Sequence, residues 1–204
     1  MNTLNITPPE NKTVFVILTK KENNALLNEQ RYNICEEVLN EHSFDFVTVD
    51  MEGESKFNPK SLVKVIGKCP IESHGVDVPE FAMGYLRQEI DNLKEEAAGL
   101  QKEYDMLGDK TTTMAQNMES WISVMKSEIA EKETALEMET KPAWLVKRIF
   151  DIASKFTEDE VYVLHFGVEK LLPKMKALFE AAGHVKVAIL DSRTQKAVSQ
   201  IVFA

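Results

Sequence analysis

Charged or polar side chains stand at the ends of four apolar segments that are predicted to form strands. Lys20, Asp50 and His165 end the first three segments, and Asp191 and Arg193 follow the fourth. Ligands of open α/β sheets collect beyond the carboxyl ends of the strands, and a histidine, a carboxylate and a lysine brought together there can transfer protons. Lys20, Asp50 and His165 are therefore the candidate catalytic or ligand-binding residues.

The same residues also have a purely structural interpretation. Loops are hydrated, so charged residues commonly end strands, and His165 lies within an apolar strand where it can be a hydrogen-bonded core residue. Antiparallel pairing would moreover send some of the strand ends to the opposite edge of the sheet. The sequence leaves open whether the three side chains converge.

No motif in the sequence specifies a cofactor or a metal. The chain has 8 glycines, and they form neither the Gly-x-Gly-x-x-Gly fingerprint of dinucleotide sites nor the Gly-x-x-x-x-Gly-Lys loop of nucleotide phosphate sites. The patterns Cys-x-x-Cys, His-x-x-x-His and Gly-x-Ser-x-Gly are also absent. We therefore expect no cofactor and no metal, and the sequence favours a non-enzymatic protein over an enzyme.

Negative charge is concentrated in one part of the chain. The net charge of the 204 residues is −9, and residues 80–140 alone hold 14 acidic and 6 basic residues, a net charge of −8. An acidic segment repels phosphate backbones, which disfavours nucleic acid as a partner. The carboxylates either keep a solvated helix face soluble or form a docking arm for a basic partner surface.

The acidic segment carries the pattern of two amphipathic helices. In the first helix, apolar residues recur at alternating spacings of three and four, the period of a coiled-coil seam: Met83, Leu86, Ile90, Leu93, Ala97, Leu100, Tyr104 and Leu107. In the second helix a looser pattern, interrupted by Lys132, follows Met114, Met118, Trp121 or Ile122, Met125, Ile129 and Leu136. These patterns predict an antiparallel helical (coiled-coil) hairpin.

The ends of the two helices are also marked in the sequence. Pro79 precedes the first helix, and Lys141-Pro142 is predicted to end the second, because proline cannot continue a helix. In the connection, Gly108 is suited to a left-handed helix end, and Thr111 or Thr112 to an N-cap.

Several side chains of the hairpin are candidate interaction residues. A stripe of methionine and tryptophan can accommodate varied partners, although it can equally be the seam between the two helices. Trp121 and Ile122 are adjacent and cannot both face one narrow seam, so one of them points toward the core, a partner or a second copy of the chain. The predicted interaction residues are Trp121, Ile122, Met118, Met125, Tyr104 and Leu107.

The rest of the chain predicts an α/β domain in two parts. Apolar or β-branched runs predict strands at 13–19, 44–50, 160–166, 185–190 and 197–203, the last two joined as a β-hairpin. Helices are predicted at 24–42, 59–67, 143–155 and 167–182, with a strand as the alternative for 59–67, and residues 69–79 are predicted to be irregular. The first strand, helix and strand favour a right-handed βαβ unit.

The fold class that follows is α/β, a small mixed sheet flanked by helices and interrupted by the inserted helical hairpin. The predicted boundaries are a flexible lead-in at 1–12, the two parts of the α/β domain at 13–79 and 142–204, and the hairpin insertion at 80–140.

The order of elements in the first part, with Val78-Pro79 after the short helix, resembles half of a thioredoxin or glutaredoxin domain. The resemblance covers about a third of the chain. It implies no redox residue here, because Lys20-Lys21-Glu22-Asn23-Asn24-Ala25 has no cysteine where the redox pair of that family would lie.

The sequence shows no feature of a membrane or secreted protein. It has no run of about 18 apolar residues, and its first residues lack the basic and apolar parts of a signal peptide. The two cysteines, Cys35 and Cys69, are expected to be buried thiols in a reducing compartment, with a disulfide between them as the alternative. A cytoplasmic protein without membrane contact is predicted.

Two functions follow from these observations. The first is a non-enzymatic protein-interaction or assembly module, an α/β platform whose acidic coiled-coil arm self-associates into a homo-oligomer or docks a partner protein. The alternative is an enzyme or small-ligand-binding protein with a site at the strand ends around Lys20, Asp50 and His165.

Overall fold

The computed structural model describes residues 4–20, 43–51 and 71–190. They form an α/β structure with a five-stranded parallel sheet and helices. They divide into two compact units, residues 78–141 and the described residues on either side of that span. The predicted helices at 24–42 and 59–67, the strand at 197–203 and both cysteines lie outside the described residues.

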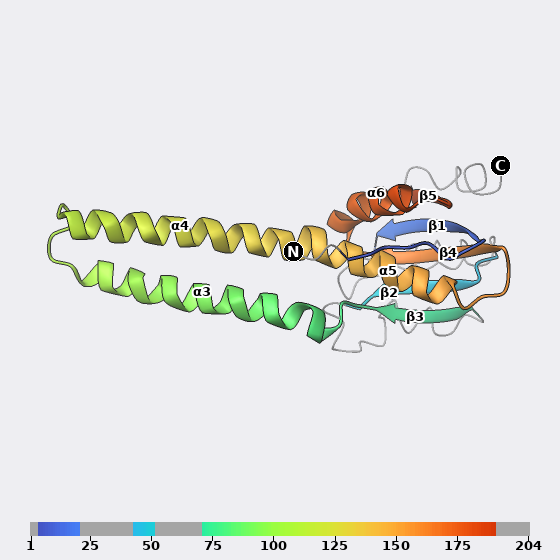
Figure 1. The fold of residues 1–204 in the computed structure, drawn as a ribbon, viewed down its shortest axis with the longest axis horizontal. Helices are drawn as coiled ribbons and strands as arrows, with labels where there is room; N and C mark the ends of the chain where they lie inside the picture. Colours follow the sequence, from blue (N-terminus) through green and yellow to red (C-terminus); the bar gives the residue numbers. More distant parts are fainter. Residues whose placement is uncertain (1–3, 21–42, 52–70, 191–204) are drawn as a thin grey trace, which may run out of the picture. The chain divides into compact units, whose positions relative to one another are not determined.

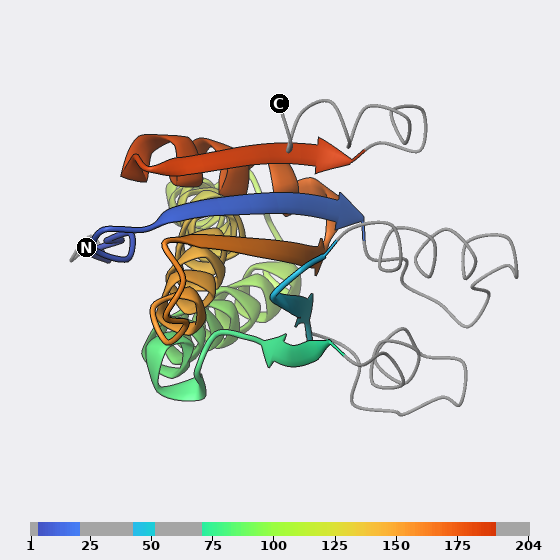
Figure 2. The ribbon, with the colours of Figure 1, turned by 90° about the vertical axis from the view of Figure 1, so that its right-hand side faces the viewer.

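The sheet unit contains its strands in the order β3-β2-β4-β1-β5. The strands are β1 (Thr13–Lys20), β2 (Phe46–Asp50), β3 (Glu72–Val76), β4 (Glu160–Gly167) and β5 (Val185–Leu190). Figure 2 shows β5, β1 and β4 lying side by side in this order. The four strands predicted at 13–19, 44–50, 160–166 and 185–190 are confirmed, although β2 begins only at Phe46.

Strand pairing differs from the sequence prediction in three respects. A mixed sheet was predicted, but every pairing between the described strands is parallel. The first two strands are not neighbours, because β4 lies between β1 and β2 and pairs with both. The irregular segment predicted at 69–79 is wrong, since it contains β3, which pairs with β2.

The sequence of β3 explains why it was missed. Glu72-Ser73-His74-Gly75-Val76 has no apolar alternation, and only Val76 is buried. The strand is at one end of the described sheet, where a polar sequence is tolerated because one side is wet. Its backbone hydrogen bonds to β2 therefore define the strand, rather than its side chains.

The core of the sheet unit is built from central strands that are buried on both faces. Residues 14–18 of β1 are all buried, which is typical of parallel strands covered on both sides. Phe46 of β2 stacks on Phe156 with ring centroids 5.2 Å apart. Two helices, α5 (Lys141–Ala153) and α6 (Leu172–Ala182), contact each other edge to face through Phe150 and Phe179, with centroids 5.3 Å apart.

The start and end of α6 follow from its flanking residues. A 3-10 turn at Glu169–Leu171 leads into the helix, and proline is accepted in the first turn, where no backbone N–H is needed. The helix ends at Gly183, whose φ of 76° is in the left-handed region that glycine adopts without steric cost. The predicted helix at 167–182 is therefore confirmed at its C-terminal end, although α6 itself begins only at Leu172.

The helical unit consists of α3 (Glu80–Met106) and α4 (Thr113–Ala135), which lie side by side along their length (Figure 1). Pro79 precedes α3 as predicted. The predicted stop at Lys141-Pro142 is wrong, because a π-helical turn (Leu136–Thr140) follows α4 directly and α5 begins at Lys141. The N–H of Lys141 donates to the carbonyl of Leu136, and Pro142 falls in a first turn, where its missing N–H costs little.

The connection between α3 and α4 is held by polar contacts rather than by a glycine. Gly108 is not left-handed as predicted, since Gly183 is the one glycine of the described chain with positive φ. The carboxylate of Asp109 accepts the N–H of Thr111 at 2.8 Å and its hydroxyl at 2.7 Å, which lowers the pKa of Asp109 below its ordinary value. Thr112 caps α4, as predicted, by accepting the N–H of Ala115 at 3.2 Å.

Candidate functional site

The strand ends predicted as a catalytic or ligand-binding site share one edge of the sheet, because the described strands are parallel. His165 is fully buried, and its Nδ1 is 2.9 Å from the hydroxyl oxygen of Thr48, the residue opposite it on β2. Asp50 is fully buried and lies two residues beyond Thr48, hence on the same face of the sheet. The structure therefore places Asp50 and His165 on neighbouring strands, on one face and within the core.

Lys20 takes a different position at this edge. It is opposite Gly167 at the end of the β1 and β4 ladder, its side chain is exposed, and its amine forms an ion pair with Glu169. An exposed pair of this kind is hydrated and weak, whereas Asp50 and His165 are removed from water. Asp191 and Arg193 lie outside the described residues.

Gly167 limits the position of the His165 ring, a feature that the sequence analysis did not identify. A Cβ atom at Gly167 would lie 2.6 Å from Nε2 of His165 and 2.9 Å from Cδ2 of Leu172. Only a residue without a side chain lets the imidazole and the β4 backbone approach this closely. No group of three or more His, Cys, Asp or Glu side chains among the described residues could hold a metal ion.

Most of the predicted interaction residues fill the seam between α3 and α4. Ile122 and Met125 are 4% and 5% exposed, and Tyr104, Leu107 and Met118 are half-buried. In α3, all eight residues of the predicted seam are buried or half-buried. Burial of this stripe follows from the helical period, which puts residues three and four apart on one face.

The seam of α4 uses a different frame from the predicted one. Buried or half-buried residues at a strict alternation of three and four define it: Ala115, Met118, Ile122, Met125, Ile129, Lys132 and, in the π-helical turn that follows, Leu136. Ala135 is also half-buried but lies outside this alternation. Met114 was predicted in the seam, which is wrong, since Ala115 is fully buried and Met114 is exposed. Alternating steps of four and three residues back from Ile122 lead to Met118 and Ala115. The same alternation forward from Ile122 reaches Lys132, which therefore occupies a seam position.

Lys132 belongs to the seam although it was predicted to interrupt it. Its amine reaches the flank of the seam, where Nζ is 2.7 Å from Oε1 of Glu89 and 3.5 Å from Oε1 of Glu128. The hydrogen bond to Glu89 raises the pKa of Lys132 above its ordinary value. A long aliphatic stem can cover apolar surface while its amine stays with carboxylates, and a polar residue at such a position fixes the register of two helices.

Trp121 is the predicted interaction residue that does not fill the seam. It is 65% exposed, whereas its neighbour Ile122 is buried. Of these two adjacent residues, Ile122 therefore faces the seam and Trp121 points away from it. Met114 and Val124 are 62% and 60% exposed on the same helix. Neither was among the predicted interaction residues, since Met114 was assigned to the seam and Val124 to no role.

One flank of the helical pair holds an ion pair and a hydrogen bond between the two helices. On this ion-pair face, which we define by Lys94, Gln101, Lys126 and Glu133, the amine of Lys94 is 2.7 Å from Glu133 and that of Lys126 is 3.1 Å from Gln101. The hydrogen bond to Glu133 raises the pKa of Lys94. An open groove of about 580 Å³ between Asp91 and Thr134 runs along the same face.

The opposite flank, which we call the tryptophan face, is defined by Glu96, Glu103, Met114, Trp121, Val124 and Glu128. The contacts of Lys132 with Glu89 and Glu128 place these two carboxylates on one side of the pair. Residues seven apart share a helix face, so Glu96 and Glu103 lie on the side of Glu89, and Trp121 and Met114 on the side of Glu128. Apolar side chains and carboxylates therefore meet on this face.

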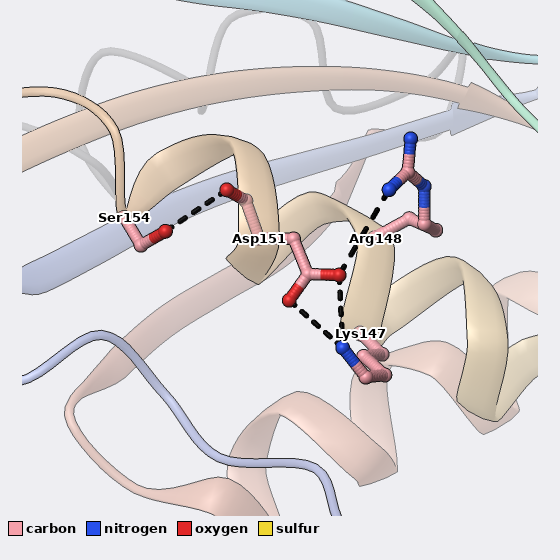
Figure 3. A network of polar contacts seen from close by, with 4 residues as sticks. All are labelled: Lys147, Arg148, Asp151 and Ser154. Carbon is pink, nitrogen blue, oxygen red and sulfur yellow. Dashed lines mark hydrogen bonds and ion pairs between the residues drawn. The ribbon is translucent and has the colours of Figure 1, made fainter.

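Two basic residues of α5, Lys147 and Arg148, share one carboxylate (Figure 3). Both carboxylate oxygens of Asp151 accept from Nζ of Lys147 at 2.9 Å, and a guanidinium nitrogen of Arg148 is 4.0 Å from the same carboxylate. The Ser154 hydroxyl donates to the backbone carbonyl of Asp151 at 2.9 Å. One carboxylate thus accompanies two cationic side chains, so part of their positive charge is offset within α5.

Comparisons of the chain with protein-family models, with curated proteins and with solved structures found no match. No helix of the described part combines the length and the apolar character needed to cross a membrane.

Proposed function

We propose that the protein is a non-enzymatic interaction or assembly module. In this proposal residues 80–140 form an antiparallel coiled-coil arm inserted into an α/β platform, and the arm self-associates or docks a partner protein. The pairing of Gln101 with Lys126 and of Lys94 with Glu133 supports opposite helix directions, because contacts earlier in α3 are made to residues later in α4. The strict alternation of three and four in both seams supports a coiled coil.

The observation that carries the proposal is the exposure of Trp121. The seam of α4 is already filled by Ile122 and its heptad neighbours, so packing between the two helices does not require a tryptophan at the next position. Tryptophan contributes more binding energy to protein interfaces than most residues, and apolar side chains gathered on a surface mark interaction sites. Met114 and Val124 extend the apolar surface on the same helix.

A measurement of solution mass tests the self-association branch of this proposal. Light scattering over a range of concentrations is carried out on the intact chain and on a variant in which a short Gly-Ser link replaces residues 83–138. Self-association of the arm would make the intact chain an oligomer and the variant a monomer, because the arm supplies the exposed apolar surface. Far-UV circular dichroism checks that the variant keeps its sheet.

If the folded variant associates as strongly as the intact chain, the arm is not the assembly device and the proposal is wrong in this form. If both proteins are monomers, self-association is excluded and docking of another protein is the form that is left.

A second candidate function is suggested by the polar residues within the core. Thr48, Asp50 and His165 occupy one face of two neighbouring strands close to the carboxyl edge, where α/β sheets bind their ligands. Such buried polar groups are uncommon in a core made of valine, leucine and phenylalanine. A ligand-binding or enzymatic site at the strand ends would account for them.

Thermal unfolding with a panel of small acids, sugar phosphates and nucleosides tests the second candidate. A ligand of this site would raise the melting temperature of the wild type, and the rise would disappear in His165→Ala. The matched control is His184→Asn, because His184 is exposed and has a φ of 55°, a conformation that asparagine also tolerates. A rise that survives in His165→Ala contradicts a site at this histidine.

A further inference from the structure

The tryptophan face combines apolar anchors with carboxylates, of which Glu128 is paired with Lys132. Met114 and Trp121 are seven residues apart, about 10.5 Å along the helix, and Val124 lies one turn further. Glu119 and Lys126 lie on the other flank, whereas over this span the exposed residues of α4 on the Trp121 side are uncharged: Thr113, Met114, Asn117, Ser120, Trp121, Val124 and Ser127. Its three large apolar side chains, Met114, Trp121 and Val124, together with the uncharged polar residues between them, form what we call the apolar strip, within the most acidic segment of the chain.

The rim of the strip is negative. Glu89 of α3 contacts Lys132 of α4, and Gln101, further along α3, contacts Lys126, which is earlier in α4. Residues later in α3 therefore lie beside residues earlier in α4, which puts Glu103 at the height of Trp121 and Glu96 at the height of Glu128 along the helix axes. Neither Glu96 nor Glu103 forms an ion pair with any residue that the structure describes. On the ion-pair face, by contrast, Glu133 is matched by Lys94.

We infer that the tryptophan face binds a basic amphipathic helix of another protein. The inference rests on the proposed function and specifies the partner of the arm. A helix with apolar residues at positions i, i+3 or i+4, and i+7 can lie along the strip and cover Met114, Trp121 and Val124. Lysine or arginine residues flanking that apolar stripe would face Glu96 and Glu103, which steers the encounter and favours basic partners over others.

Charge decides against the other occupants of the face. A second copy would bring its own Glu96, Glu103 and Glu128 against those of the first, and like charges across an interface are repulsive. Nucleic acids and anionic lipid surfaces are repelled by the same carboxylates. A basic helix is the occupant for which both the apolar strip and its rim are favourable.

A peptide titration of the full-length chain tests the inference. The probe is a synthetic helix of about three heptads with leucine on its apolar face and lysine on its flanks, and the matched peptide carries glutamate in place of lysine. The Trp144→Phe variant leaves Trp121 as the one tryptophan of the chain, so its fluorescence reports directly on the face. We expect the lysine peptide to bind and shift the emission to the blue, and the glutamate peptide to bind at least tenfold more weakly.

Two sets of variants identify the surface. Trp121→Ala, read with a fluorescein-labelled peptide, is expected to weaken binding at least tenfold. Glu96→Gln with Glu103→Gln is expected to weaken it at least fivefold and to reduce its salt dependence, because the removed charges face the peptide. Glu95→Gln with Glu119→Gln removes the same charge from exposed positions off the tryptophan face and is expected to change binding less than twofold.

Each contrary outcome overturns the inference. Equal loss of binding in the two double variants would show a general attraction to an acidic protein, and unchanged binding in Trp121→Ala would show that the face is not used. If the intact chain is a dimer that Trp121→Ala dissociates, a second copy occupies the face, so the inference fails while the proposed function stands. If the arm neither associates in light scattering nor binds the lysine peptide, the inference fails, and the proposed function is reduced to docking of a partner with a different surface.

Discussion

Replacing Ile122 by alanine is expected to lower the free energy of unfolding of the helical unit by about 2–4 kcal/mol. Ile122 is 4% exposed and lies one turn from Met125, which is buried in a cluster with Ile90, Ala97 and Ile129. The substitution removes three carbon atoms from a seam between two straight helices, and the rigid backbones allow only partial closure of the cavity. Urea unfolding followed by far-UV circular dichroism measures the loss.

The neighbouring residue supplies the matched control. Trp121→Ala removes a larger side chain, yet it is expected to change the free energy of unfolding by no more than about 0.5 kcal/mol, because Trp121 is 65% exposed. If Trp121→Ala lowered the free energy of unfolding more than Ile122→Ala does, the assignment of Ala115, Ile122 and their heptad neighbours to the seam would be wrong.

The difference between these two residues shows what sequence periodicity can and cannot determine. In α3 every apolar residue at spacings of three and four is buried or half-buried, so the prediction of that stripe holds residue by residue. In α4 the exposed residues Met114, Trp121 and Val124 are as apolar as the seam, and Lys132 within the seam is charged. Hydrophobicity alone is then consistent with two sets of seam positions, one that includes Met114 and Trp121 and one that includes Ala115 and Ile122. Only packing against α3 distinguishes them.

The strands were predicted more reliably than their order. Apolar runs identify β1 and β4, since burial on both faces leaves few polar positions within them, and His165 is the exception in β4. Neither the polar strand β3 nor the position of β4 between β1 and β2 has a side-chain signature, because backbone hydrogen bonds form the ladder. The contact between Thr48 and His165 depends on that order, and so could not be predicted from either residue.

Replacing Gly167 by alanine is expected to destabilise the sheet unit by about 1–3 kcal/mol. The added Cβ would lie 2.6 Å from Nε2 of His165 and 2.9 Å from Cδ2 of Leu172, distances that force side chains to move. Neither neighbour moves easily, because both are buried and Nδ1 of His165 is held 2.9 Å from the Thr48 hydroxyl. The same substitution at Gly99, where a Cβ meets no atom within 4 Å, is expected to stabilise helix α3 by about 0.5–1 kcal/mol.

A double-mutant cycle shows whether the imidazole is the cause of the cost at Gly167. In a His165→Ala background the ring is gone, so Gly167→Ala is expected to cost at least about 0.5 kcal/mol less than in the wild type. The destabilisation that persists in this background would come from the contact with Leu172. Repeating Gly167→Ala in a Leu172→Ala background tests that second contribution. Equal costs in both backgrounds would mean that the ring rotates away freely, and the position of His165 beside Thr48 would then be set by β2 alone rather than by Gly167.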